Sequence, residues 1–242
     1  MPTFARGDAT IYYEEYGAGY PLVLFAPGGM RSTIAFWRRS AFDPTAALAD
    51  SFRVIAMDQR NAGQSRAPIR DDDWATYTAD HVALLDHLGI ERCHIMGGCI
   101  GSSYCLGLCA AAPGRISAAV LQNPIGLSAD NRDEFRRMFD EWAAEVAPQH
   151  PEADAATFAA FRERLFGGDF VFSVSTDYVR TCPVPLLVLP GDDAFHPAAT
   201  AREIADLAPQ AELVPVWRTP DVIDATVRRV RDFLAAHTPG TR

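Results

Sequence analysis

The chain of 242 residues contains no lysine, so all 22 of its basic residues are arginine. Without a lysine amine, the protein cannot form a pyridoxal Schiff base or use lysine as a nucleophile. The formal net charge is −9, and no segment gathers arginines into the basic stripe that phosphate binding needs. These absences exclude lysine-based covalent catalysis and argue against a nucleic-acid partner.

Long hydrophobic runs are also missing. No segment approaches the roughly 18 consecutive apolar residues of a membrane-spanning helix. Residues 1–6 lack the basic-then-apolar layout of a secretion signal. We therefore expect a cytoplasmic protein with no membrane partner.

Cysteines are few and odd in number: Cys93, Cys99, Cys105, Cys109 and Cys182. They form no paired framework, which fits a reducing compartment. Cys105 and Cys109 lie four residues apart on a predicted helix, where burial as small hydrophobic side chains is favoured over metal ligation. The sequence predicts no metal site and no cofactor.

Apolar runs alternate with helical patterns along the chain, which is typical of an α/β fold with a mostly parallel sheet. With 48% hydrophobic residues, the chain can form one domain with a large core, or one domain carrying an insertion. The predicted strands span residues 9–13, 22–25, 53–57, 93–96, 118–122, 185–189 and 212–216. The predicted helices span residues 78–88, 100–112, 198–207 and 220–236.

Residues 127–178 interrupt this alternation. Phe135, Phe139 and Trp142 recur at helical spacing, as do Phe158, Phe161 and Leu165 in a second segment. We expect residues 127–178 to form a helical lid on a core of residues 1–126 and 179–242. Phe135, Phe139 and Trp142 are candidates for an apolar substrate pocket; the alternative is that these side chains pack the lid's own core.

A cysteine lies at a predicted sharp turn between the strand at 93–96 and the helix at 100–112. The turn reads Gly97-Gly98-Cys99-Ile100-Gly101. Small residues are needed on both sides of Cys99 because such a turn is strained and brings backbone segments close together. The helix dipole at this position favours thiolate over thiol, so Cys99 is a candidate nucleophile. The alternative is a buried cysteine in a glycine-rich turn.

Five segments in order resemble the α/β-hydrolase family and cover most of the chain. They are the strand and loop at 21–30, the turn Asp58-Gln59-Arg60-Asn61-Ala62-Gly63-Gln64-Ser65, residues 84–90, the Cys99 turn, and residues 188–197. The resemblance implies a mostly parallel central sheet flanked by helices, with a lid inserted after the strand at 118–122. Asn61 stands where the family usually has glycine.

The resemblance also implies roles for individual residues. Cys99 would be the nucleophile and Asp193 the acid that orients the base. The oxyanion hole would use the backbone N–H of Ile100 with that of Gly29 or Met30. Asp58 is expected instead to hold its turn through backbone hydrogen bonds.

The family's histidine has no counterpart after the last predicted strand, where residues 212–221 contain no histidine. His196 follows Asp193 by three residues, which span at most about 10 Å. We hypothesise that His196 replaces the missing base, oriented by Asp193 or Asp192; the alternative is that it faces water. Trp217 lies near the usual position of the base and is a further candidate for the substrate pocket.

The other histidines are weaker candidates for the base. His94 lies on the strand before Cys99 and is expected to be a satisfied strand residue. The remaining four are expected to be solvated: His81, His87, His150 and His237.

The favoured function is a cysteine-dependent acyl hydrolase that acts on a small, largely apolar ester, thioester or lactone. One alternative is an acyltransferase of the same fold, since a thioester intermediate also reacts with amines, thiols and alcohols. Another is a nonhydrolytic lyase or a binding protein on a hydrolase scaffold, because a fold does not fix its function. The expected partner is a small-molecule substrate, and a homodimer is possible.

Overall fold

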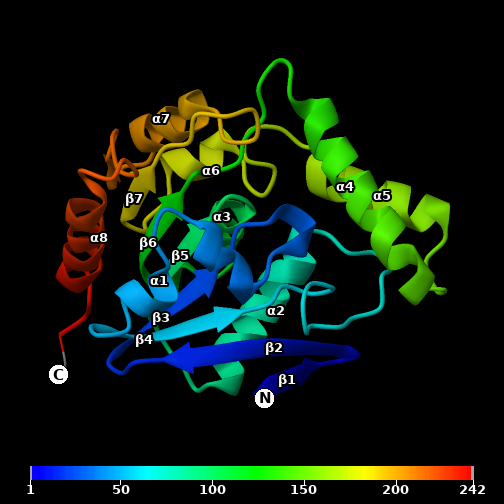
Figure 1. Cartoon of the computed structure of the whole chain (residues 1–242), viewed down its shortest axis with the longest axis horizontal. Coiled ribbons are helices and arrows are strands. Elements are labelled where there is room, and N and C mark those ends of the chain that lie inside the picture. The colour runs from blue at the N-terminus through cyan, green and yellow to red at the C-terminus, as the bar shows by residue number, and fades with distance from the viewer. Residues whose placement is uncertain (1, 241–242) are drawn as a thin grey trace.

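An eight-stranded sheet forms the centre of the molecule in the computed structural model, which describes residues 2–240 (Figure 1). The strand order is β1-β2-β4-β3-β5-β6-β7-β8. The pairs β1–β2 and β2–β4 are antiparallel, and the other pairs are parallel. The strands are β1 (Thr3–Arg6), β2 (Ala9–Tyr16), β3 (Tyr20–Phe25), β4 (Phe52–Met57), β5 (Cys93–Gly98), β6 (Ile116–Gln122), β7 (Leu186–Leu189) and β8 (Ala211–Leu213).

Helices cover both faces of this sheet. The α-helices are α1 (Pro44–Ala47), α2 (Trp74–His87), α3 (Ile100–Ala111), α4 (Arg132–Val146), α5 (Ala155–Phe166), α6 (Thr176–Arg180), α7 (Ala198–Leu207) and α8 (Ile223–Ala236). Short 3-10 helices include η1 (Gly29–Arg31) and η2 (Ile34–Arg39). This layered arrangement is the α/β-hydrolase fold that the sequence predicts.

Alternate residues of the central strands enter two separate cores. In β3, Val23 and Phe25 belong to the core that also holds side chains of α2 and α3. Leu22 and Leu24 point the other way, into the core beneath α8. Because successive side chains of a strand point to opposite faces, an almost continuous apolar strand fills both cores.

Local chemistry explains where several elements differ from expectation. Helix α2 begins four residues before its predicted start because Asp73 and Thr76 form a capping box. The last strand, β8, ends at Leu213, two residues before Pro215, which has no N–H to extend the pairing. The four-residue strand β1 and the short helices α1 and α6 carry too few residues to show a periodic pattern.

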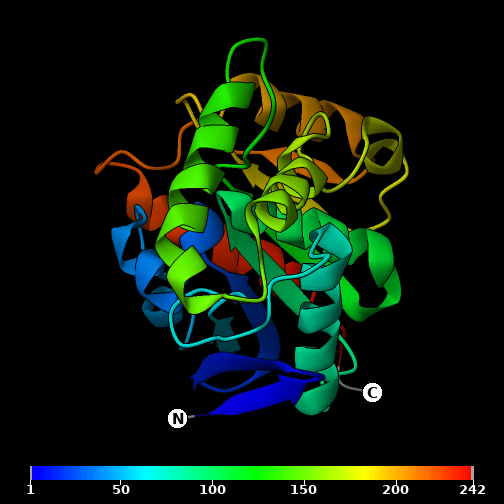
Figure 2. The same cartoon turned by 90° about the vertical axis from the view of Figure 1, so that its right-hand side faces the viewer.

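The connection from β6 to β7 carries α4, α5 and α6. Helices α4 and α5 lie side by side; Figure 1 shows them apart from the sheet, and in Figure 2 they lie in front of it. Phe139 of α4 contacts Trp142, and both contact Phe161 of α5, with ring centroids 5.2–6.0 Å apart. Helix α4 also contacts η1, the loop after β3. The aromatic residues therefore join the two helices over the loop at the end of β3.

No helix in residues 2–240 combines the length and apolar character required to cross a membrane.

Candidate active site

Cys99 occupies a sharp turn between β5 and α3. Its backbone has φ 56° and ψ −121°, a conformation that residues with a side chain rarely adopt. A Cβ on Gly97 would lie 2.0 Å from the carbonyl oxygen of Gly101, and a Cβ on Gly101 would lie 2.0 Å from that of Phe25. Glycine at these two positions allows the turn to pack against β3. Cys99 is the one partly exposed cysteine; the other four are buried.

Asp193 and His196 lie in the loop between β7 and α7. The two carboxylate oxygens of Asp193 lie 2.7 and 2.8 Å from Nδ1 of His196. The N–H of His196 donates to the backbone carbonyl of Asp193 at 3.1 Å, which closes the loop into a turn. The imidazole is 15% exposed, so it does not face water as the alternative interpretation required.

The imidazole of His196 and the thiol of Cys99 perturb each other. Burial lowers the pKa of His196, but the neighbouring sulfur and the Asp193 carboxylate together outweigh burial and raise the pKa to about 9. Burial raises the pKa of the Cys99 thiol, but His196 and the backbone N–H groups of Gly28 and Ile100 lower the pKa more in sum. The pair therefore favours a thiolate beside an imidazolium.

Nε2 of His196 is buried and has no partner in regular hydrogen-bond geometry within the described chain. Its interaction with the sulfur is therefore looser than an ordinary hydrogen bond. Loose contacts of this kind are common between catalytic groups before a substrate is bound. Nε2 thus lies where it can hold the proton that the thiol gives up.

Backbone N–H groups surround the sulfur from two segments. Ile100 supplies one from the first turn of α3, as the sequence predicts, and Gly28 supplies another that sequence reasoning missed. Gly28 and Gly29 have φ of 122° and 57°, in the region that favours glycine. Gly29 lines the cavity beside Cys99, whereas Met30 is buried and does not.

A small apolar cavity of about 200 Å³ adjoins Cys99 and His196. It is lined by Gly28, Gly29, Cys99, Ile100, Ile125, Phe135, Met138, Phe195 and His196. Of the four side chains predicted to line a substrate pocket, Phe135 lines this cavity. Phe139 and Trp142 do not, because they pack against α5 in the core of the helical insertion. Sequence reasoning missed Ile125 and Phe195, which lie in loops, and Met138, which follows Phe135 by three residues on α4.

The prediction for Trp217 is also corrected. Its indole is buried in the core beneath α8, and its Nε1–H donates to the carbonyl of Pro190 at 2.8 Å. Arg218 forms an ion pair with Asp192, with its guanidinium carbon 5.9 Å from the Trp217 ring centroid. These residues fill the region after β8 where the resemblance places a histidine. Asp192 is thereby engaged away from His196, and the partner of His196 is Asp193.

Asp58 holds the turn after β4, as the sequence predicts. Its oxygens accept the N–H groups of Ile34 and Gln64, both at 2.8 Å. A Cβ on Gly63 would lie 2.2 Å from Oδ2 of Asp58, so glycine is required there. Asn61 has φ 57°, and its side chain accepts the N–H of Ala67 at 2.7 Å. Asn61 thus adopts the positive φ at a position where the family usually has glycine.

The remaining histidines lie outside the site. His94 is buried, and its Nε2 lies 2.9 Å from the Thr238 hydroxyl, as expected for a satisfied strand residue. His81 is not solvated: it is buried, with Nε2 2.8 Å from Oε1 of Gln59, and burial lowers its pKa to about 3. His81 lies with Tyr77 on the buried face of α2.

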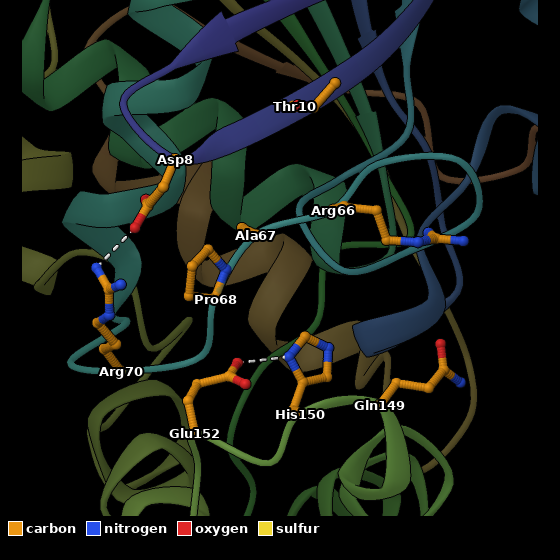
Figure 3. Close-up of a pocket in the computed structure, with 9 residues that line it drawn as sticks. All are labelled: Asp8, Thr10, Arg66, Ala67, Pro68, Arg70, Gln149, His150 and Glu152. Atoms are coloured by element: carbon orange, nitrogen blue, oxygen red, sulfur yellow. Dashed lines mark hydrogen bonds and ion pairs between the residues drawn. The ribbon is translucent and has the colours of Figure 1, made fainter.

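A larger cavity of about 570 Å³ lies where the β1–β2 turn meets the helical insertion (Figure 3). Four of its polar side chains form two pairs: Arg70 with Asp8 at 2.7 Å, and His150 with Glu152 at 2.8 Å. The guanidinium of Arg66 donates to the backbone carbonyls of Gly63 and Ser65. No cysteine or serine lines it. Residues 2–240 contain no group of three or more His, Cys, Asp or Glu side chains that could hold a metal ion. The candidate chemistry therefore lies in the smaller cavity at Cys99.

Comparisons with known proteins agree with this architecture. A family model described as the alpha/beta hydrolase fold matches residues 21–214. A non-heme chloroperoxidase of Streptomyces lividans is 33% identical over 262 residues, which cover 88% of this chain and 90% of the relative. A solved meta-cleavage product hydrolase of Pseudomonas fluorescens superposes with a TM-score of 0.75 at 21% identity, covering 98% of both chains. At this identity the structural likeness shows the fold alone.

Other relatives match over a shorter length. A protein of Azorhizobium caulinodans named as a carbamate hydrolase is 35% identical over 123 residues, which cover 51% of this chain and 44% of the relative. The chain spans about half the length of this and two further curated relatives, which are covered over 51% and 42%.

Proposed function

Because this chain belongs to the alpha/beta hydrolase family, we propose that it is a cysteine-dependent acyl hydrolase with Cys99 as nucleophile and His196 as base. The observation that carries the proposal is that Cys99 and His196 line one cavity, while both carboxylate oxygens of Asp193 contact Nδ1 of His196. The two groups also shift each other's pKa in the direction that favours the thiolate of Cys99. The relative named as a carbamate hydrolase supports the hydrolytic class.

The first step forms a thioester between enzyme and substrate. The thiolate of Cys99 attacks the substrate carbonyl, a C–S bond forms, and the carbonyl electron pair moves to oxygen. We assign the stabilisation of this oxyanion to the backbone N–H groups of Ile100 and Gly29, because both residues line the cavity. The bond to the leaving group then breaks, and His196 gives that group its Nε2 proton.

The second step releases the acid. Nε2 of His196 takes a proton from water as the water oxygen bonds to the acyl carbon, and the C–S bond then breaks to return the thiolate. The acid product leaves with the acyl group and the water oxygen. Asp193 keeps Nδ1 of the ring protonated throughout and stabilises the positive charge on the ring.

A cysteine nucleophile is compatible with a base such as His196, which comes from the loop between β7 and α7. A serine hydroxyl needs a well-aligned base, whereas a few per cent of a cysteine is already thiolate at neutral pH. The loose geometry at Nε2 of His196 is therefore less damaging to a thiol than to a hydroxyl. We infer that the cysteine nucleophile compensates for a histidine base that comes from the loop after β7 and not from the segment after β8.

Acyl transfer is the second candidate, and the apolar cavity favours it. Of the nine residues that line the cavity, five present only hydrocarbon or thioether side chains, which disfavour ordered water. An amine, thiol or alcohol could then compete with water for the thioester.

Turnover of p-nitrophenyl acetate and an acetyl thioester tests the proposal. We expect Cys99→Ala to abolish turnover and His196→Ala to reduce kcat/KM by roughly 100-fold or more. His87→Ala, which alters an exposed histidine, is the matched control and should retain activity. Unchanged turnover in Cys99→Ala would overturn the proposal. Acetylated products formed with added hydroxylamine or thiol would distinguish transfer from hydrolysis.

A further inference from the structure

The cavity at Cys99 is small for a ligand site. Its volume of about 200 Å³ lies below the range of roughly 300–1,000 Å³ for drug-sized ligands. An acyl group of a few carbon atoms fits this space, and a long chain does not.

Met138 of α4 closes the cavity above the loop after β3. Its sulfur lies 2.6 Å from the position that a Cβ on Gly29 would take, so the thioether rests directly on this glycine. Arg31 of η1 and Glu145 of α4 form an ion pair at 2.8 Å, which holds the helix over the loop. Met138 is thus fixed by its helix but has a flexible side chain.

The opposite wall is aromatic and rigid. Phe195 packs edge-on against Phe135, with ring centroids 5.2 Å apart. Phe135 in turn stacks on Phe166 at 5.6 Å and meets Phe172 at 4.7 Å. Since these rings are locked together, the depth available to an acyl chain depends on Met138.

The lining also selects against charge. His196 is the one side chain at this cavity that can carry a positive charge, and it is engaged by Asp193 and the Cys99 sulfur. A carboxylate on the acyl group would lose its hydration without gaining a free cationic partner, which is unfavourable.

From this geometry we propose that the substrate carries a short, uncharged hydrocarbon acyl group, and that Met138 sets the maximum length of that group. This inference rests on the proposed acyl-enzyme at Cys99. It assigns to α4 a direct part in substrate selection, and it predicts that removing the thioether opens the cavity toward α4.

The test compares p-nitrophenyl acetate, butanoate and octanoate, together with the p-nitrophenyl monoester of succinate, on wild type and Met138→Ala. We expect kcat/KM of the wild type to fall roughly tenfold or more from butanoate to octanoate, and equally from butanoate to the charged ester. Met138→Ala should reduce the difference between butanoate and octanoate to less than about threefold and leave the difference between butanoate and the charged ester unchanged. Met138→Leu should retain the wild-type preference. Arg137→Ala changes the exposed residue before Met138 on α4 and is the control for a substitution in this helix outside the cavity.

Two failures are distinguishable in this experiment. If mass spectrometry finds no acyl adduct on Cys99 with any of these esters, the proposed acyl-enzyme fails. If adducts form but octanoate reacts as fast as butanoate in the wild type, or Met138→Ala keeps the wild-type preference, the assignment of Met138 is wrong. Faster reaction of the charged ester than of butanoate would refute the uncharged acyl group.

Discussion

Both carboxylate oxygens of Asp193 contact Nδ1 of His196, at 2.7 and 2.8 Å. The proposed acid and base therefore come from one short turn after β7, rather than from two strand ends. The carboxylate of Asp193 also accepts the N–H groups of Phe195 and His196, at 2.9 and 3.1 Å. These hydrogen bonds hold the turn, and the turn holds the imidazole against Asp193.

Substitution of Asp193 should reduce activity without changing the fold. In Asp193→Asn the imidazole loses its carboxylate partner, so the pKa of His196 falls and its tautomer is no longer fixed. We expect kcat/KM to fall roughly 100-fold or more. Asp192→Asn is the matched control because Asp192 pairs with Arg218, and its kcat/KM should stay within about threefold of wild type. Equal losses in the two variants would contradict the assignment of the acid.

The pH dependence of alkylation reports the ion pair between Cys99 and His196. The pKa of Cys99 is lowered, so its thiolate persists as pH falls below the ordinary thiol range of about 8.5. His196 remains protonated up to its raised pKa of about 9. The ion pair of thiolate and imidazolium therefore exists from the lowered pKa of Cys99 up to about pH 9. Iodoacetamide labelling should show an inflection below about pH 8.5 in the wild type and a higher one in His196→Ala.

Peptide mapping provides the control for this labelling. Cys93, Cys105, Cys109 and Cys182 are buried and should remain unlabelled in the native protein. An inflection that does not move in His196→Ala would show that the imidazole does not stabilise the thiolate.

A buried charge cluster makes Arg60 important for stability. Its guanidinium donates to Asp72 and to Asp80, each at 2.8 Å, and all three side chains are at most 7% exposed. Arg60→Met leaves two buried carboxylates without this partner, so the free energy of unfolding should fall by about 3–5 kcal/mol. Arg53→Met removes a partly exposed pair with Glu15 and should cost less than about 1 kcal/mol. Urea denaturation of both variants measures the difference, and equal losses would contradict it.

Glycine at position 101 is required by the approach of α3 to β3. In Gly101→Ala the new Cβ would lie 2.0 Å from the backbone oxygen of Phe25, so the helix must shift. We expect a loss of about 3 kcal/mol in the free energy of unfolding, together with loss of thiol reactivity. Gly107→Ala on the same helix is the control, because its Cβ comes no nearer than 3.2 Å to Thr78. Thermal unfolding of both variants should show a much larger decrease in Tm for Gly101→Ala.

The sequence contains enough information to predict the fold and the centre of the site. The order of strands follows from apolar runs that fill two cores at once, and Cys99 is marked by glycines that the turn requires. The pairing of Asp193 with His196 follows from a spacing of three residues, which keeps the two side chains within reach.

Contacts between distant segments could not be predicted in the same way. Met138 reaches Gly29 only because α4 lies over η1, and nothing in the spacing of α4 shows this. Trp217 resembled a pocket residue because of its place after β8, but its indole fills the core beneath α8. The burial of His81 depends on the packing of α2 against other elements, since its ring centroid lies 4.2 Å from that of Phe25 in β3 and 5.3 Å from that of Tyr104 in α3.

A rapid-quench mass measurement tests the central claim most directly. The enzyme is mixed with p-nitrophenyl acetate, quenched in acid within its first turnovers, and digested for peptide mapping. We predict one acetyl group on the peptide that carries Cys99, formed more slowly in His196→Ala and absent in Cys99→Ala. Turnover of the ester with no acetyl group on Cys99 at any quench time, or equal turnover in Cys99→Ala, would contradict the account.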